Sequence, residues 1–410
     1  MGTPDQVSLT ALLLLPSPWR IVGSHLDSER RKLTVQVDYP TGMAVSCPVC
    51  QAACVVHDHR EPRHYRHLDC MEYQTWVVCR LPRSRCEVHG VKTVAVPWAE
   101  PLSRMTRKFE AHCIKVLQSC ETVTAAQRLL GLGESEVMTV RRRAVERGLL
   151  RRDLGTLRRG GLDEKSFLRG QSFVTVLSDI DRGCVVEVTQ QRTQAAAEQA
   201  LSVIPEEKRG EIEAMAMDMH QPFVNAVQTT LQNADIVHDR FHIKKHLNDA
   251  VNKVRRDEHK ERLCSGDRSL SGKRYLFLRN PDNFSEQELL SFEELCEMQL
   301  RVTRAWWLKE LFDDLYTYRS EAWARRFFQK WFFRATHSHL PPIAKVAWML
   351  KERFEHVVTY VKHRITNAVA EGLNSKIQAL KSAARGFRTF ANYRIAILFH
   401  CGSLDMLPAT

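Results

Sequence analysis

One segment, residues 159–189, most constrains what this chain can fold into. Asp163 ends a short apolar run, a turn at Gly170 follows, and Ser172–Ser178 is rich in β-branched and aromatic residues. After a second turn comes a similar run, Cys184–Thr189. Turn residues between apolar runs of period two predict adjacent antiparallel strands. We therefore expect Asp163 at the mouth of a sheet, where its carboxylate can face both solvent and a metal ion.

Two further acids have comparable settings. Asp218 ends a short apolar run that predicts a strand, and Glu371 lies in a helical stretch much later in the chain. Two divalent cations held by carboxylates can activate the attacking hydroxyl and stabilise the leaving oxygen in phosphodiester cleavage. Because magnesium takes only one or two carboxylates per ion, three acids suffice. Asp163, Asp218 and Glu371 are therefore the candidate catalytic residues and the candidate ligands of Mg²⁺ or Mn²⁺, although most acidic residues in a chain are surface charges.

The elements predicted after the first segment alternate between helices and strands. They are a helix at Thr193–Val203, a strand ending at Asp218, a helix at Pro222–Leu231, a strand at Ala234–His242 and a helix at Ile243–Arg256. This order predicts a mixed α/β sheet with flanking helices. Residues 265–350 break the pattern because they are helical and rich in aromatic residues. We expect an all-helical insertion there, with its aromatics forming a core and base stacking as the alternative role.

The N-terminal part of the chain predicts a metal-binding β domain. Residues 17–40 alternate apolar and polar residues, and six of the twelve cysteines lie in residues 47–86, among histidines. Such clustering in a long chain favours a metal site over a disulfide framework. Two close pairs of soft ligands predict a structural zinc ion held by Cys47, Cys50, Cys86 and His89. Seven neighbours are the alternatives for any one ligand: Cys54, His57, His59, His64, His67, Cys70 and Cys79.

Residues 103–152 change to a helical pattern with many basic residues. Thr122–Arg143 predicts a helix, a tight turn at Gly131 and a second helix. The second helix carries the arginines that we expect to contact DNA in the major groove, namely Arg141, Arg142, Arg143 and Arg147. An ordinary helical hairpin with a charged outer face is the alternative. The net charge of +12 at pH 7 also favours a polyanionic partner.

No segment of the sequence predicts membrane insertion. The run Leu12–Leu15 is too short for a signal-peptide core and lacks a basic flank before it. No stretch approaches the roughly 20 apolar residues that span a bilayer. We therefore expect a soluble, cytosolic-type chain without a membrane partner.

Several motifs, in their order along the chain, resemble a known family. They are Cys47–Cys50, Arg83–His89, the predicted helix-turn-helix, Gly161–Phe167, His238–Arg256 and Asn367–Arg388. Together they resemble the bacterial insertion-sequence transposases of the ISL-three group. The resemblance implies an RNase H-like DDE catalytic domain in which Asp163, Asp218 and Glu371 are the three acids. It also makes Asp239 the main competitor for a metal role, within a structural strand His238–His242 beside the site.

The resulting prediction is an α+β multidomain protein. Its expected parts are an N-terminal zinc-binding β domain (1–98), a helix-turn-helix DNA-binding domain (99–155), an RNase H-like mixed α/β catalytic domain (156–264 and 351–405) and an all-helical insertion (265–350). Two residues depart from the family pattern, because Gln51 stands where glycine is usual and His89 where cysteine is common.

The resemblance also implies a function. A transposase of this group would bind the terminal inverted repeats of an insertion sequence, hydrolyse the strand at the element end and direct the freed 3′-hydroxyl at target DNA. Paired ends imply a dimer or larger assembly on DNA in the bacterial cytoplasm, associated with the nucleoid. Lys376, Arg385 and Arg388 would hold phosphates near Glu371. The alternatives are a DNA-binding regulator without catalytic activity, in which the three acids lie apart, and a nuclease that cuts without joining.

Overall fold

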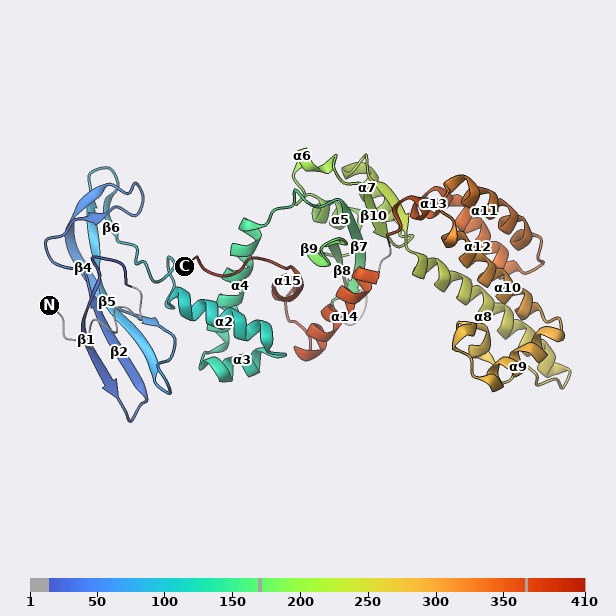
Figure 1. The fold of residues 1–410 in the computed structure, drawn as a ribbon, viewed down its shortest axis with the longest axis horizontal. Coiled ribbons are helices and arrows are strands. Elements are labelled where there is room, and N and C mark those ends of the chain that lie inside the picture. Colours follow the sequence, from blue (N-terminus) through green and yellow to red (C-terminus); the bar gives the residue numbers. More distant parts are fainter. Residues whose placement is uncertain (1–14, 169–171, 366–367, 410) are drawn as a thin grey trace. The chain divides into compact units, whose positions relative to one another are not determined.

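The computed structural model describes residues 15–168, 172–365 and 368–409. The predicted turn at Gly170 and the start of the motif at Asn367 therefore lie outside the described residues. The chain forms two compact units, one of residues 1–152 with 404–410 and the other of residues 153–403. The second unit is thus inserted into the sequence of the first (Figure 1).

The first unit begins with a six-stranded sheet of order β1-β2-β5-β4-β3, in which β6 also pairs with β5. The strands are β1 Arg20–Asp27, β2 Lys32–Asp38, β3 Val45–Ser46, β4 Ala53–Arg66, β5 Gln74–Cys86 and β6 Gly90–Thr93. Side chains of β5 alternate between buried and more exposed positions over most of the strand, as the pleat requires. The core includes Trp19 and Trp98, whose rings meet edge to face at 4.9 Å. The alternating N-terminal sequence thus forms a sheet, as predicted.

Three helices follow this sheet: α2 Arg107–Ser119, α3 Val123–Leu130 and α4 Glu134–Arg151. Thr106 and Thr122 cap α2 and α3, because each threonine hydroxyl accepts the backbone N–H three residues further on. Gly131 ends α3 in the left-handed conformation, with φ of 64°, where a side chain would be strained. The predicted helix, glycine turn and second helix are confirmed.

A segment from the far end of the chain packs against α4. Arg147 donates a hydrogen bond to the carbonyl oxygen of Met406 at 2.5 Å. A Cβ atom on Gly148 would lie 2.6 Å from the Cβ of Leu404, so this helix position requires glycine. Residues 404–409 therefore complete the packing of the first unit.

The second unit is built on a five-stranded sheet of order β11-β10-β7-β8-β9. Its strands are β7 Arg159–Ser166, β8 Phe173–Asp179, β9 Cys184–Gln190, β10 Ala214–Met217 and β11 Asp235–His238. β7, β8 and β9 pair antiparallel, as the sequence predicts, whereas β10 runs parallel to both β7 and β11. The sheet is thus mixed, and the carboxyl ends of its three parallel strands lie at one edge.

Helices cover both faces of this sheet (Figure 1). The covering helices are α5 Gln194–Leu201, α7 Gln221–Thr230, α8 Arg240–Cys264 and α15 Phe390–Cys401, whereas the short helix α6 Glu206–Arg209 has no buried residue. Alternate residues of β10 belong to different cores, since Met215 packs in the cluster of α5 and α7 and Ala216 packs in that of α8. Burial on both faces explains why this strand is a continuous apolar run. α15 lies along β9, where Arg394 forms a bidentate ion pair with Glu187 at 2.6 Å.

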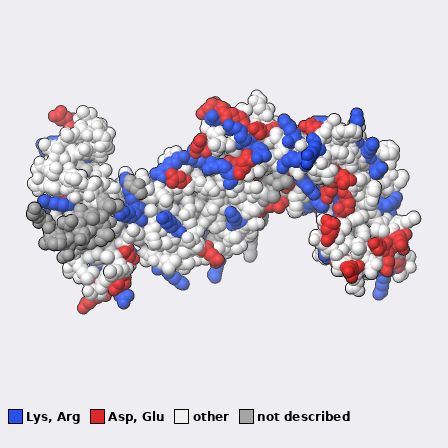
Figure 2. All heavy atoms as spheres, viewed as in Figure 1, with Lys and Arg blue, Asp and Glu red and all other residues white. Residues whose placement is uncertain are grey.

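The rest of the second unit is mainly helical, and no helix in the described ranges is both long and apolar enough to cross a membrane. The remaining helices are α9 Glu286–Glu297, α10 Arg301–Asp313, α11 Glu321–Thr336, α12 Pro341–Glu352, α13 Phe354–His363 and α14 Ala368–Ala383. Phe312 and Trp331 are fully buried among them, so the predicted aromatic core is present. Trp307, Trp323 and Trp348 are exposed instead. Acidic side chains gather over the region of α9, at the lower right of Figure 2.

The predicted strand at Ala234–His242 is wrong in its second half. β11 ends at His238, because the Asp239 side chain accepts the Phe241 N–H at 3.2 Å and so caps α8. His242 therefore lies on the first turn of a helix and not in a strand beside the site.

Candidate functional site

Three aspartates follow the parallel pairing of the second sheet. The register pairs Met217 of β10 with Leu162 of β7 and with His238 of β11. The next residue after each of these is an aspartate, namely Asp163, Asp218 and Asp239. Because adjacent strands lie about 4.8 Å apart, these aspartates form one row along the edge of the sheet. We call them the aspartate row.

Asp163 is held by two hydrogen-bond donors. Its Oδ1 accepts the Glu164 N–H at 2.7 Å, and its Oδ2 accepts a hydrogen bond from Nδ2 of Asn374 on α14. Burial raises the pKa of Asp163, and the hydrogen bond from Asn374 opposes that rise. Asn374 thus ties α14 to β7 and fixes the orientation of this carboxylate.

Glu371 lies on α14, one helical turn before Asn374. Residues three apart share a helix face, so Glu371 is on the side of α14 that meets Asp163. Its side chain is exposed. Burial raises the pKa of Asp239, and the negative charges of Glu371 and Asp163 add to that rise. The structure therefore brings the three acids predicted from the sequence to one region, together with Asp239.

His242 contacts the other two members of the aspartate row. Its Nδ1 lies 3.4 Å from Oδ2 of Asp218, and its Nε2 lies 3.9 Å from Oδ2 of Asp239. Asp218 also accepts the Met219 N–H at 2.5 Å. Asp239 is the most buried of the three aspartates, at 6% exposed. The site thus combines four carboxylates, one imidazole and one amide.

Asn374 and His242, which contact the candidate acids, were not predicted from the sequence. Each stands three residues after a candidate acid, Glu371 and Asp239 respectively. Helical spacing alone would have placed Asn374 beside Glu371. His242 could not be found in that way, because its segment has the apolar and polar alternation of a strand.

A second cluster of ligating side chains lies in the first unit. One ligand atom each from Cys47, Cys50, Cys86 and His89 all lie within 4.8 Å of one another, the only such group found among the described residues. The Sγ atoms of Cys50 and Cys86 are 3.7 Å apart, and Nδ1 of His89 is 3.6 Å from Cys86 Sγ. A tetrahedral ion bonded to sulfur at about 2.3 Å separates its ligands by roughly 3.8 Å. The geometry fits one tetrahedral ion, with Nδ1 of His89 as the fourth ligand.

Backbone turns present these ligands. Gln51 has a φ of 60°, in the left-handed region, and its N–H donates to the carbonyl oxygen of Cys47 at 2.9 Å. This conformation explains why glycine is usual at the position that Gln51 occupies. The backbone N–H of His89 hydrogen-bonds to Cys86 and lowers the pKa of that thiol to about 7. A lowered pKa favours the thiolate, which is the form that binds metal.

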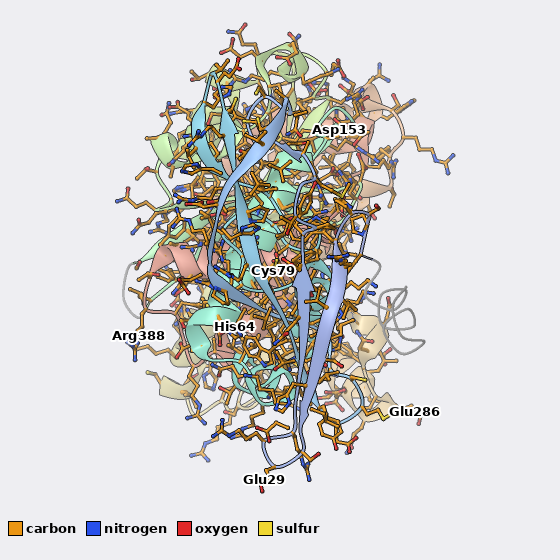
Figure 3. The ribbon with its side chains drawn as sticks, turned by 90° about the vertical axis from the view of Figure 1, so that its left-hand side faces the viewer. Glu29, His64, Cys79, Asp153, Glu286 and Arg388 are labelled. Atoms are coloured by element: carbon orange, nitrogen blue, oxygen red, sulfur yellow. The ribbon has the colours of Figure 1, made fainter. Side chains whose placement is uncertain are left out.

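The seven alternative ligands do not join this group in the part of the chain that the structure describes. Cys79 lies within the body of the sheet, where burial raises the pKa of its thiol to about 12 (Figure 3). His67 is also buried, with its Nδ1 2.8 Å from Oγ1 of Thr106. Cys54 lies near the cluster, but its thiol donates to the carbonyl oxygen of Ala52 at 3.4 Å.

The structure corrects the predicted DNA contacts of Arg141 and Arg147. Arg141 faces the interior, at 4% exposed, and burial lowers the pKa of its guanidinium to about 10. Arg147 is also buried, and its Nη2 lies 2.6 Å from a carboxylate oxygen of Glu110 and 2.7 Å from one of Glu100. Both side chains are therefore buried against the rest of the chain and present no surface to DNA.

Helical geometry explains this correction. Successive residues of a helix are turned by about 100°, so three consecutive arginines cannot all face outward. Arg142 is exposed, whereas Arg143 donates to Glu100 at 2.9 Å. Ser135 and Thr139 are exposed on the same face of α4 as Arg142. This face, and not the whole set of arginines, is the candidate DNA contact.

The basic residues after Glu371 also divide into two groups. Lys376, Arg385 and Arg388 are exposed, and Figure 3 shows Arg388 at the periphery. Lys381 instead donates to the carbonyl oxygen of Ser166 at 2.8 Å. The first three are the cations with exposed side chains near the end of α14.

Comparison with known proteins identifies the family. Residues 94–145, which include α2, α3 and most of α4, match the helix-turn-helix domain of transposase family ISL3. Residues 161–397, more than half of the chain, match the DDE domain of ISL3 transposases, a family with the description Transposase. The chain belongs to the ISL3 family of insertion-sequence transposases.

Two relatives show how far the similarity extends. The transposase for insertion sequence element IS1001 of Bordetella parapertussis is 26% identical, and the match covers 85% of this chain and 87% of that protein. The transposase for insertion sequence element IS1557 of Mycobacterium tuberculosis is 24% identical, with 84% of this chain and 83% of that protein covered. The family resemblance carried by the motifs is confirmed, and the protein is a DDE transposase that binds DNA.

Proposed function

We propose that this transposase binds the terminal inverted repeats of an insertion sequence and catalyses strand cleavage and strand transfer with divalent cations. The observation that carries the proposal is the register of β7 and β10, which puts Asp163 and Asp218 side by side. Glu371 is supplied by the helix that Asn374 anchors to Asp163. A DNA-binding regulator has no need of three acids in one region, so the arrangement favours an enzyme.

The topology of the second unit supports an RNase H-like catalytic domain. Three antiparallel strands precede two parallel strands with helices between them, and α14 packs against β7. Helices α9 to α13 separate β11 from the acid on α14, as an insertion would. We assign residues 156–264 and 351–403 to the catalytic domain and residues 265–350 to the insertion, because residues 404–409 pack with the first unit. Residues 1–98 and 99–155 form the zinc-binding and DNA-binding domains.

The residues of the site fit Mg²⁺ or Mn²⁺, because carboxylate oxygens are the donors that these hard cations take. When bound, two such cations would activate the attacking hydroxyl and stabilise the charge on the leaving oxygen. Asp163, Asp218 and Glu371 would hold them. Asn374 orients the carboxylate of Asp163, and His242 contacts that of Asp218.

The chemistry consists of two displacements at phosphorus. In the first, the oxygen of water loses a proton and forms the new bond to phosphorus, while the bond from phosphorus to the 3′-oxygen at the element end breaks and that oxygen takes up a proton. In the second, the resulting 3′-hydroxyl loses its proton and attacks a phosphodiester of target DNA, whose own 3′-oxygen leaves and takes up a proton. The exposed side chains of Lys376, Arg385 and Arg388 neutralise phosphates near Glu371.

DNA recognition belongs to the first unit. Arg142, Ser135 and Thr139 reach base edges from the exposed face of α4. Cys47, Cys50, Cys86 and His89 would hold a zinc ion, which would stabilise the turns beside β5. Because two element ends must be joined to one target, the active form is a dimer or larger assembly on DNA, within the bacterial cytoplasm.

A cleavage and joining assay on oligonucleotides that carry the element ends tests this function. Asp163→Asn, Asp218→Asn and Glu371→Gln should each reduce both reactions about a thousandfold, equivalent to about 4 kcal/mol of transition-state stabilisation. Asp181→Asn is the matched control, because Asp181 pairs with Arg159 at the opposite edge of the same sheet. All four variants should bind DNA like the wild type.

Three outcomes would contradict the proposal in different ways. Full activity of one acid variant would show that this residue is wrongly assigned. A wild type that binds DNA without cutting it would favour the regulator. Cleavage without joining would favour a nuclease.

A further inference from the structure

We propose that Asp239 is a fourth carboxylate ligand of the catalytic cations, an inference that rests on the function proposed above. In the register of the parallel strands, Asp218 stands between Asp163 and Asp239, one strand from each. Asp239 is therefore as near to Asp218 along the aspartate row as Asp163 is. Two catalytic ions lie about 3.5–4 Å apart, so a carboxylate beside Asp218 on this row is within reach of an ion that Asp218 binds.

One carboxylate oxygen of Asp239 is buried and has no hydrogen-bond partner. The side chain is 4% exposed, and its Oδ2 accepts no hydrogen bond in the structure. The Nε2 of His242 is 3.9 Å from this oxygen, beyond hydrogen-bond distance. Burying a charged oxygen without a partner costs free energy, and such atoms in native proteins commonly face an ion or a water. A divalent cation beside Oδ2 would offset this cost.

The charges around Asp239 also indicate that a cation binds beside it. The carboxylates of Glu371 and Asp163 both act on Asp239 through space, and the imidazole of His242 acts in the opposite sense. Like charges that converge in a buried site destabilise one another unless a cation lies between them. Asp239 therefore shares its electrostatic environment with the residues that the proposed function assigns to the cations.

Capping of α8 does not explain this side chain fully. The cap uses Oδ1, which accepts the Phe241 N–H, and leaves Oδ2 without a role. Serine or asparagine would cap a helix about as well as aspartate. The helix dipole favours a negative charge here, but it supplies no partner for a buried oxygen. Coordination of a cation by Asp239 accounts for both the charge of this side chain and the position of Oδ2.

Substitutions of Asp239 that preserve the helix cap distinguish its role as a cap from its role as a ligand of the cations. Asp239→Asn and Asp239→Ser both retain a capping oxygen and remove the charge. Mn²⁺ is titrated into the full-length protein and followed calorimetrically, because binding is then measured without any reaction. We expect the affinity of the site to fall by about tenfold or more in both variants, as in Asp163→Asn. The control Asp181→Asn should bind Mn²⁺ like the wild type.

Thermal unfolding without Mn²⁺ checks the fold of each variant. Removal of a buried charge from among other carboxylates should leave the melting temperature of Asp239→Asn unchanged or raise it. Excess Mn²⁺ should then stabilise the wild type more than this variant. Wild-type affinity for Mn²⁺ in both Asp239 variants, alongside a loss in Asp163→Asn, would overturn the inference and leave the proposed function intact. Absence of Mn²⁺ binding by the wild type would overturn both.

Discussion

Arg147 and Glu110 form an ion pair inside the first unit, where Glu110 is 1% exposed. Removal of one partner leaves the other charge buried, which typically costs more than the pair contributes. We expect Arg147→Met to lower the free energy of unfolding by about 3 kcal/mol, as measured by denaturant titration. Arg142→Ala is the matched change on the exposed face of α4 and should leave stability unaltered.

The same two variants should also differ in their binding to DNA. Arg142→Ala removes a cation from the exposed face, so it should weaken binding and reduce the slope of log affinity against log salt by about 1. Arg147→Met should keep the wild-type slope under conditions where it is folded. If Arg147→Met stayed stable and lost this salt dependence, the original assignment of Arg147 to DNA would be right.

His67 makes the first unit sensitive to acid. Burial lowers the pKa of His67 to about 4, and the charges of Lys108 and Arg66 add to this effect. Since the ordinary value is 6.5, the unfolded chain takes up a proton first as the pH falls. The contribution of neutral His67 to stability is therefore complete above pH 6.5 and is lost as the pH falls from there toward 4.

A conservative variant tests this pH dependence. His67→Gln keeps a polar group beside Thr106 but does not titrate. The slope of the unfolding free energy against pH between 6.5 and 4 should be smaller in this variant than in the wild type. Equal slopes would show that other groups cause the acid sensitivity.

The sequence predicts the positions of candidate acids that stand at the end of an apolar run. Asp163 and Asp218 each end an apolar run. Asp218 directly follows β10, and Asp163 follows the part of β7 that pairs with β10, although β7 itself continues to Ser166. Arg141 and Arg147 were placed wrongly because charge alone does not tell which face of a helix a residue occupies. Spacing from the buried Val140 would have placed Arg147 inside, since residues seven apart return to the same face.

Among the elements, we expect the turns that carry Cys47 and Cys50, and Cys86 and His89, to depend most on the proposed zinc ion. Without an ion, three sulfur atoms and an imidazole would lie in close contact with little to hold them. We expect one equivalent of zinc per chain by elemental analysis. Cys86→Ser, or a strong chelator, should release it and lower the melting temperature of the first unit.

Serine substitution elsewhere provides the control for this test. Cys70 is exposed and outside the group, so Cys70→Ser should keep both the zinc and the melting temperature. Loss of zinc in Cys70→Ser, or full retention in Cys86→Ser, would contradict the ligand assignment.

The boundaries of an element could be predicted where a residue at its end favours only one local structure. Gly131 marks the end of α3 because its left-handed conformation suits glycine, and Thr122 marks the start of the same helix. The boundary between β11 and α8 was not predictable, because Asp239 acts as a cap inside an alternating sequence. Alternation and capping compete there, and capping decides the structure. The parallel pairing of β10 with β7 also depends on contacts distant in sequence, which no local pattern specifies.

At the scale of the whole molecule, the first unit includes residues that follow the entire second unit in the chain. Arg147 donates to Met406, and Arg151 donates to the carbonyl oxygen of Leu407 at 2.7 Å. A chain truncated after Ser403 should therefore show a lower melting transition for the first unit and weaker DNA binding. The Mn²⁺ affinity of the second unit should be unchanged. Wild-type melting and DNA binding in the truncated chain would show that this segment is dispensable.

The insertion of the second unit into the first has a consequence for the order of synthesis. The ribosome makes residues 404–409 only after the entire second unit, so the contacts of Arg147 with Met406 form last. The helices that recognise DNA thus reach their final packing only in a chain that already carries its acids. Prematurely terminated chains would compete poorly for element ends, which would favour occupation of those ends by molecules able to cut.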